Sequence, residues 1–136
     1  MFILDTNVIS ELRTSTADGA VRAWFGLRTP SDLYLSAISV FELEHGVRRM
    51  ERRDQIQGAR LRRWLDEDVL DLFRGRVLPI DHVVAVRAAG LHVHDPRPER
   101  DCFIAATALV HAMTVVTRNM KDFQGLGVLV VNPWDG

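Results

Sequence analysis

Residues 2–7 read Phe-Ile-Leu-Asp-Thr-Asn, a short apolar run that ends at an acidic residue and a turn signal. A continuous apolar run of this length is typical of a strand buried on both faces, and Asp-Thr-Asn is a common start for a helix. A second run, Thr-Val-Val-Thr at 114–117, has the same character and also leads into a turn. Strands buried on both faces occur in parallel sheets, because helices then cover the sheet on each side. The two runs therefore predict a parallel sheet.

Outside these two strands, the sequence alternates between helical and extended patterns. We expect helices from about residue 7 to 13 and at 17–28, 39–53, 55–73, 82–94 and 101–113, and further strands at 33–35, 77–78 and 128–131. This alternation predicts a three-layer α/β/α fold with a central parallel sheet. Because the sequence contains no repeat and no linker, we expect residues 1–136 to form a single domain.

The composition is that of a globular protein, with 47% hydrophobic and 26% charged residues. No apolar run reaches the roughly 20 residues that a membrane helix needs, so no membrane association is expected. Asp5 interrupts the apolar start too early for a signal peptide, and Cys102 is the only cysteine, which excludes an internal disulfide. We expect a cytoplasmic protein.

Net charge gives little guidance to function, because its formal value is only −1. Sixteen of the 17 basic residues are Arg, and seven of them lie between Arg48 and Arg63. Arg is suited to bidentate contacts with phosphate, yet pairs at i, i+4 spacing, such as Glu44–Arg48, are also usual on solvated helices. We favour a solvated face over an RNA-binding track for this segment.

Several acidic residues are expected at one edge of the sheet. In open parallel sheets, ligands gather beyond the carboxyl ends of the strands. The side chains expected near that edge are those of Asp5, Glu42, Asp101, Asn119 and Asp122. Clustered carboxylates repel one another and raise each other's pKa unless a cation lies among them. Mg²⁺ prefers oxygen ligands and can activate water for hydrolysis, so these acids could form a hydrolytic metal site.

Each acid also has an ordinary structural interpretation. Asp5 could cap the helix that follows it, and Asp101 could be the N-cap or a first-turn acid of the helix that it opens. Glu42 stands three residues after Ser39, the spacing of a capping box. Asp122 could be a turn residue. From the residues alone, a metal site and four separate structural roles both remain open.

The sequence also resembles the PIN-domain family, and most closely its VapC type of ribonuclease toxin. The resemblance lies in residues 2–11, 36–46, 101–108 and 115–123 and in Asn-Pro-Trp at 132–134, which are similar to the family's motifs and stand in the family's order. It spans the chain from end to end. It implies a PIN-like domain with the activity of a Mg²⁺-dependent endoribonuclease, with Mn²⁺ as an alternative metal.

The resemblance also implies roles for individual residues. Asp5 and Asp101 match the positions assigned most consistently as metal ligands, Glu42 matches the third acid, and Asp122 or Asn119 occupies the fourth region. Some relatives have a carboxylate where this chain has Asn119, so one metal or two remains open. Thr6, Asn7 and Thr117 could orient these carboxylates, and Arg118 could either contact a substrate phosphate or pair with one of the acids.

The partners implied by the resemblance are an RNA substrate, a VapB-like antitoxin protein and a second copy of the chain in a homodimer. Residues 55–73 carry more apolar side chains than one helix face usually buries, so they could contribute to an antitoxin groove or simply to the core. The alternatives to a toxin are a PIN nuclease that processes RNA outside toxin–antitoxin systems and a catalytically weak nucleic-acid-binding or interaction module. A phosphoryl-accepting receiver domain is disfavoured, because no acid pair stands beside Asp5.

Overall fold

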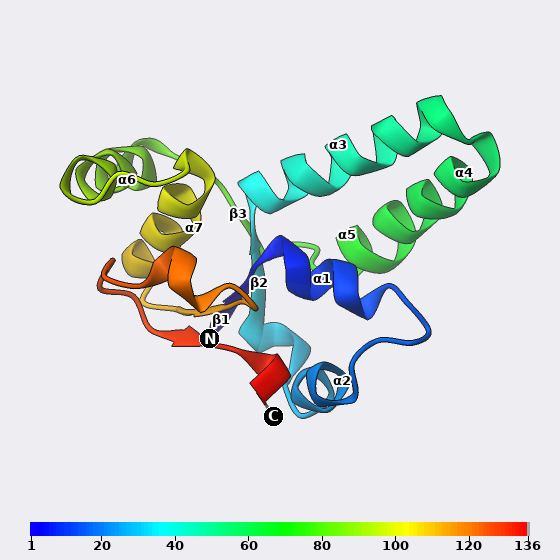
Figure 1. The fold of residues 1–136 in the computed structure, drawn as a ribbon, viewed down its shortest axis with the longest axis horizontal. Helices are drawn as coiled ribbons and strands as arrows, with labels where there is room; N and C mark the ends of the chain where they lie inside the picture. The colour runs from blue at the N-terminus through cyan, green and yellow to red at the C-terminus, as the bar shows by residue number, and fades with distance from the viewer. Residues whose placement is uncertain (136) are drawn as a thin grey trace.

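The computed structural model describes residues 1–135 and contains a five-stranded parallel sheet (Figure 1). The strands are β1 (Phe2–Leu4), β2 (Leu33–Ser36), β3 (Val77–Leu78), β4 (Thr114–Val116) and β5 (Val130–Val131), in the order β3-β2-β1-β4-β5. The chain winds from β1 to β2 and β3 on one side, then crosses to β4 and β5 on the other. The point where the winding direction changes therefore lies between β1 and β4, and ligands of open parallel sheets bind at such points.

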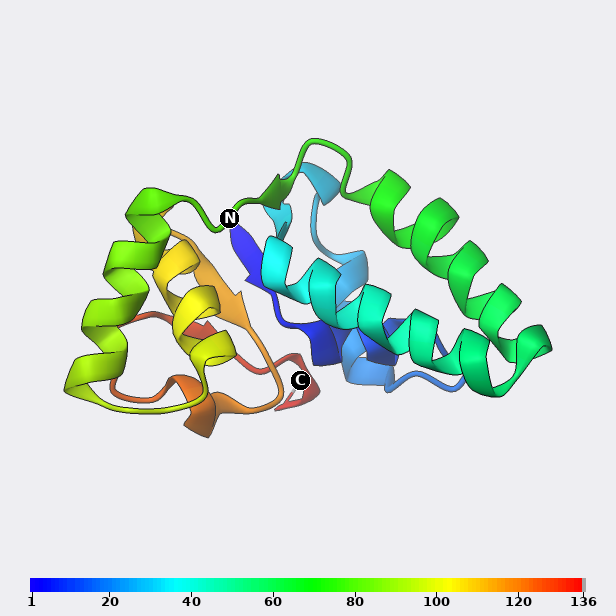
Figure 2. The same ribbon diagram turned by 90° about the horizontal axis from the view of Figure 1, so that it is seen from above.

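Helices cover both faces of the sheet, which confirms the three-layer α/β/α fold. They are α1 (Thr6–Leu12), α2 (Gly19–Gly26), α3 (Ala37–Arg53), α4 (Gln55–Arg63), α5 (Leu70–Leu72), α6 (His82–His94) and α7 (Glu99–Val110). Figure 2 shows α6 and α7 on one side of the sheet and α3, α4 and α5 on the other. Within residues 1–135, no helix is long and apolar enough to cross a bilayer.

Alternate residues of the central strands enter different cores, because side chains along a strand point to opposite faces. Leu4 and Val116 face a core formed with α1 and α3, in which Leu43 and Phe73 are buried. Ile3 and its neighbours on the other face pack against α7 and the turn after β4. Both faces are therefore covered, as the continuous apolar runs predict.

Two helices differ from their predictions: the helix predicted at 39–53 begins earlier, and the helix predicted at 55–73 contains a π-helix. Helix α3 begins at Ala37, and Ser36 is its N-cap, with its side-chain oxygen accepting a 3.1 Å hydrogen bond from the Ile38 amide. The predicted capping box of Ser39 and Glu42 is therefore wrong. The predicted helix at 55–73 is divided, because a π-helix at Trp64–Val69 separates α4 from α5.

The Arg-rich helices α3 and α4 are joined by ion pairs. The predicted pair Glu44–Arg48 forms at 2.6 Å, and Arg62 contacts Glu44 at 2.7 Å and Glu51 at 3.2 Å. Hydrogen bonds from Arg62 and Arg48 lower the pKa of Glu44 to about 2, so this carboxylate is ionised at neutral pH. These contacts support the interpretation of the basic segment as an ion-paired, solvated surface.

Gly58 allows α4 to cross closely over α3, and its substitution should destabilise the protein. A Cβ atom at Gly58 would lie 2.5 Å from the Glu51 Cα atom, so the backbones would have to separate. We expect Gly58→Ala to lower the free energy of unfolding by about 1–3 kcal/mol. Gly90 in α6 is the matched control, because a Cβ there meets nothing within 4 Å. Gly90→Ala should raise stability by about 0.5–1 kcal/mol. Urea denaturation measures the free energy of unfolding of both variants. If both substitutions changed it in the same direction, the close approach of α4 to α3 at Gly58 would not be the cause.

Candidate active site

The candidate site lies between β1 and β4, where the winding direction of the sheet changes. Asp5 follows β1, and Thr117 follows the neighbouring strand β4. Both residues are fully buried, and the Thr117 hydroxyl donates a 2.8 Å hydrogen bond to Asp5 Oδ2. Parallel pairing of β1 and β4 thus brings together two residues that are 112 positions apart in the sequence.

The two carboxylate oxygens of Asp5 have different partners. Oδ1 accepts a 2.7 Å hydrogen bond from the Thr6 amide, as an N-cap of α1 does. Oδ2 accepts from Thr117 and, at 3.4 Å, from the Asn7 side chain. The cap interaction is therefore confirmed, and it holds the carboxylate at the carboxyl edge of the sheet.

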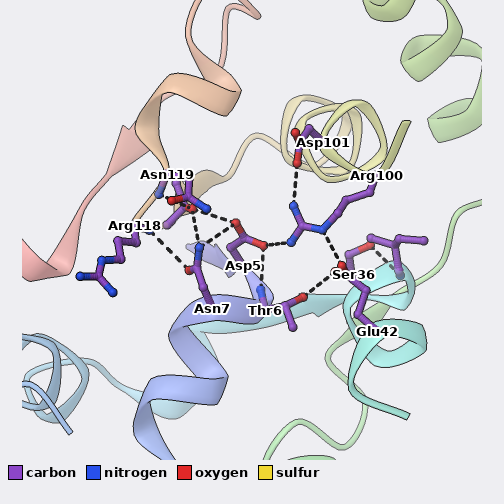
Figure 3. Close-up of polar contacts among 11 residues, drawn as sticks. Asp5, Thr6, Asn7, Ser36, Glu42, Arg100, Asp101, Arg118 and Asn119 are labelled. Atoms are coloured by element: carbon purple, nitrogen blue, oxygen red, sulfur yellow. Dashed lines mark hydrogen bonds and ion pairs between the residues drawn. The ribbon is translucent and has the colours of Figure 1, made fainter. Parts of the chain in front are cut away.

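Three carboxylates converge on the guanidinium of one arginine, Arg100 (Figure 3). Arg100 Nε donates to Glu42 Oε2 at 2.7 Å, and Nη1 donates to Asp101 Oδ1 at 2.6 Å. Nη2 donates to Asp5 Oδ1. Acids from three separate segments are thus grouped around a single cation, as the prediction of a shared site requires.

Arg100 is the member of this cluster that the sequence analysis missed. It lies in the first turn of α7, where the positive end of the helix dipole disfavours a cation. Burial lowers its pKa, but the hydrogen bond to Glu42 and the charges of Asp5 and Glu42 outweigh that effect and raise it overall. Arg100 is therefore charged. A basic residue in the first turn of a helix, beside an acid, is the signal that could have identified it.

Asp101 is the third residue of α7, which confirms the prediction of a first-turn acid and excludes the alternative of an N-cap. Pro98 precedes the helix instead, and the Asp101 side chain is 4% exposed. Burial raises the pKa of Asp101, Arg100 lowers it, and the nearby charges of Asp122 and Asp5 raise it further, for a net increase. Ionisation of Asp101 is therefore less favourable than for an exposed aspartate, and Arg100 offsets part of this cost.

Glu42 lies in the second turn of α3 and reaches the site from the side opposite Asp101. Its Oε1 accepts a 2.7 Å hydrogen bond from the Thr6 hydroxyl, and its Oε2 is bound by Arg100. At 30% side-chain exposure, Glu42 is the most accessible of the three carboxylates. Thr6, like Asn7 and Thr117, orients an acid, as predicted from the sequence.

The fourth predicted region borders the cluster without joining it. Asp122 lies in the 3₁₀ turn Met120–Phe123, as the turn interpretation predicts, and its charge acts on Asp101. The Asn119 amide donates a 3.0 Å hydrogen bond to the Thr117 hydroxyl. The Arg118 guanidinium lies over the ring of Trp134, 5.2 Å from its centroid, and points away from Asp5 in Figure 3. The predicted pairing of Arg118 with a site acid is therefore not what the structure shows.

The carboxylates of the cluster are chemically suited to a divalent cation, but their present positions are too far apart to bind one ion together. Within residues 1–135, no three acidic, His or Cys side chains are close enough to hold one ion as they stand. The guanidinium of Arg100 lies between the three carboxylates instead. Carboxylate oxygens are the ligands that Mg²⁺ prefers, and all three already face one positive centre. An open groove of about 460 Å³ lined by Thr6, Ser10 and Asn119 leads to this point.

Thr117 should contribute to stability through its hydroxyl. The hydroxyl bonds Asp5, accepts from the Asn119 amide and lies 3.3 Å from the Asn7 side-chain nitrogen. Thr117→Val keeps the shape but leaves a buried carboxylate oxygen without this donor. We expect the free energy of unfolding to fall by about 1–3 kcal/mol. Thr114→Val, at the start of the same strand, should change it by less than about 0.5 kcal/mol. Equal effects of the two substitutions in thermal denaturation would exclude this role.

Comparisons with known proteins agree on one family. A family model described as PIN domain matches residues 2–127. The chain is 38% identical over 143 residues to VapC ribonuclease Y4jK of Sinorhizobium fredii, covering 99% of each protein. It is 38% identical over 142 residues to toxin FitB of Neisseria gonorrhoeae, covering 98% of this chain and 99% of that protein. The crystal structure of FitAcB from Neisseria gonorrhoeae superimposes with a TM-score of 0.91, at 38% identity over 98% of this chain and 99% of the other.

Proposed function

This chain belongs to the PIN-domain family, and from that membership we propose that it is a metal-dependent endoribonuclease, the toxin of a toxin–antitoxin pair. The observation that carries the proposal is the convergence of Asp5, Glu42 and Asp101 on the guanidinium of Arg100. This cluster lies between β1 and β4, where the winding direction of the sheet changes. Relatives similar over nearly the whole chain are named a ribonuclease and a toxin, which supports the same activity here.

Asp5, Asp101 and Glu42 would hold Mg²⁺ or Mn²⁺, with Asp122 as a fourth acid beside them. When bound, the metal supplies Lewis-acid stabilisation of the charge that develops on the phosphodiester. Thr117 and Asn7 keep the Asp5 carboxylate in place through hydrogen bonds to Oδ2. Fixed ligand orientation of this kind typically changes metal affinity or activity by about 10–100-fold.

Glu42 is the carboxylate of this set that is most open to solvent. In this proposal its Oε2 faces the metal, and Thr6 holds the other oxygen, Oε1, by a hydrogen bond. The groove beside it is wide and open, which suits a single-stranded or looped RNA whose backbone can approach the carboxylates.

Cleavage of a total RNA pool tests the activity. Purified protein with Mg²⁺ or Mn²⁺ should give discrete fragments, and EDTA or Asp5→Asn should abolish them. Asp18→Asn is the matched control, because Asp18 also caps a helix, by accepting from the Ala20 and Val21 amides, but it precedes α2 and lies outside the site. Asp18→Asn should cut at the wild-type rate. A folded wild-type protein that cuts nothing with either metal would instead favour a nucleic-acid-binding module.

An antitoxin partner would bind the apolar groove beside the π-helix. Leu12, Trp64 and Leu72 line this groove, and Leu72 is 38% exposed. Leu72→Asp should weaken co-purification with the protein encoded by a short adjacent gene by about 30-fold or more, the effect of losing an interface hot spot. Leu129→Asp, at a residue that is 75% exposed and directly precedes β5, should leave co-purification unchanged. If no adjacent small protein binds, a nuclease outside toxin–antitoxin systems becomes the better proposal.

A homodimer stays a prediction of the family resemblance. Sedimentation equilibrium of the purified chain tests it directly. A mass near twice 15.4 kDa would support the dimer, and a mass of 15.4 kDa at micromolar concentration would oppose it.

A further inference from the structure

Arg100 occupies the place where the three carboxylates of the cluster would hold a metal ion. Its Nε and Nη1 are bound to Glu42 and Asp101 at 2.7 and 2.6 Å, and its Nη2 is bound to Asp5. Each of the three guanidinium nitrogens donates to a different carboxylate. One side chain therefore bridges three acidic residues that are supplied by different parts of the chain.

The arginine and a metal ion cannot bind these carboxylates together. Mg²⁺ needs oxygens at about 2.0–2.1 Å, and one oxygen of each carboxylate, Asp5 Oδ1, Asp101 Oδ1 and Glu42 Oε2, already accepts from Arg100. A guanidinium among the same oxygens would also repel the ion. Occupancy by one therefore excludes the other.

Two groups of the cluster are partly exposed, Arg100 and Glu42, and Glu42 is also held by the Thr6 hydroxyl. Asp5 is fully buried and is also held by Thr6 and Thr117, and the Asp101 side chain is 4% exposed. The Arg100 side chain is 28% exposed and has a long flexible stem. It can leave the cluster by rotating its own side chain, while the buried carboxylates stay in place.

The charge balance favours such an exchange. Three carboxylates surround one guanidinium, so the arginine neutralises only part of their charge, and Asp122 adds a further negative charge nearby. A divalent ion would neutralise more of it. Partly compensated buried charge is costly to a fold, which gives the cluster a reason to accept a stronger cation.

From this geometry we propose that Arg100 is a resident cation, which holds the three carboxylates in the metal-free protein and which the metal must displace. The inference rests on the proposed metal-dependent function. It makes Arg100 a positioning residue: it keeps the acids assembled before the metal arrives, and it lowers the apparent metal affinity by the fraction of molecules in which it occupies the cluster.

Direct binding of Mn²⁺, measured by isothermal titration calorimetry, tests the displacement. Arg100→Gln should bind Mn²⁺ about tenfold more tightly than the wild type or better. Arg100→Lys keeps the charge but lacks the planar fork that bridges three acids, so its affinity should lie between the two. Arg118→Gln controls for loss of a positive charge near the site, because Arg118 lies over Trp134 and not on the acids. Its affinity should stay within about twofold of the wild type.

Two further readouts do not depend on activity. In EDTA, Arg100→Gln should melt at a lower temperature than the wild type, and Mn²⁺ should raise its melting temperature by more. In NMR spectra of the wild type, the Arg100 Nε–H signal should shift as Mg²⁺ is added, because its bond to Glu42 is broken.

The results distinguish displacement of Arg100 from the proposed dependence on a metal ion. If Mn²⁺ binds the wild type and Arg100→Gln with equal affinity, the displacement is wrong, while the metal site stands. If Arg100→Lys binds like the wild type, charge alone acts, and the bridging role is wrong. If neither the wild type nor a folded Arg100→Gln binds Mn²⁺, both the displacement and the proposed metal dependence are wrong.

Discussion

Asp101→Asn is expected to reduce RNA cleavage by about 10³-fold, equivalent to about 4 kcal/mol of transition-state stabilisation. Asp101 would be one of the two principal metal ligands, and an amide lacks the charge needed to hold the ion. The same change should not lower the melting temperature of the metal-free protein. Burial raises the pKa of Asp101, so ionised Asp101 opposes folding, and a neutral side chain of the same shape removes that cost.

Rates of RNA cleavage in Mn²⁺ test the predicted loss of activity. Melting curves in EDTA test the prediction that the melting temperature does not fall. Asp66→Asn serves as a control, because Asp66 is 51% exposed and contacts Arg62 outside the site. It should change neither quantity appreciably. Wild-type cleavage by Asp101→Asn would remove Asp101 from the site, and inactivity together with a collapsed fold would show that its role is structural.

Phe123→Ala should have the largest effect on stability, a loss of about 3–5 kcal/mol. Phe123 is 1% exposed and packs with Ile3, Ile104 and Val115 in the core beneath the 3₁₀ turn that carries Asp122. Removing the ring leaves a cavity between the sheet and α7 that the rigid surroundings can fill only in part.

Met120→Ala is the matched control for Phe123→Ala, because Met120 lies on the same turn but is 41% exposed. It should cost less than about 0.5 kcal/mol. Urea denaturation with unchanged m-values gives both free energies. A loss below about 1 kcal/mol for Phe123→Ala would mean that this turn is not anchored by its aromatic side chain.

The strands and the layers could be predicted from the sequence, because they depend on local patterns. The apolar run at 2–4 is buried on both sides, and the run at 114–116 pairs with it along its whole length. The burial of Leu4 and Ile3 in different cores is the feature that continuous apolar strands encode.

Helix boundaries were less predictable, since two residues can compete for one role. Ser36 and Ser39 both precede an apolar run, and either could cap the helix. The structure uses Ser36, while Ser39 is fully buried inside the helix. The division of 55–73 by a π-helix likewise depends on packing: Leu65 and Val69 are both buried in the first core, which local periodicity does not show.

The acidic residues of the candidate site could be predicted from the sequence, but their contacts with Arg100 could not. Asp5, Glu42 and Asp101 were identified from position and resemblance, and the structure brings them together. Arg100 is hard to predict, because a basic residue beside an acid in the first turn of a helix is a weak signal that does not indicate its distant partners. Its contacts to Asp5 and Glu42 span 95 and 58 residues and exist only in the folded chain.

We propose that these carboxylates and a metal ion hydrolyse RNA by attack of water. The chemical ends of the cleaved RNA identify the attacking nucleophile. Attack by water leaves an ordinary phosphate monoester on one fragment and a hydroxyl on the other, and a 2′-deoxy nucleotide at the cleavage position should not prevent cutting. We predict such ends in Mn²⁺ and no cleavage in EDTA. Fragments ending in 2′,3′-cyclic phosphate, formed equally well in EDTA, would show that the ribose hydroxyl is the nucleophile and that no metal is required.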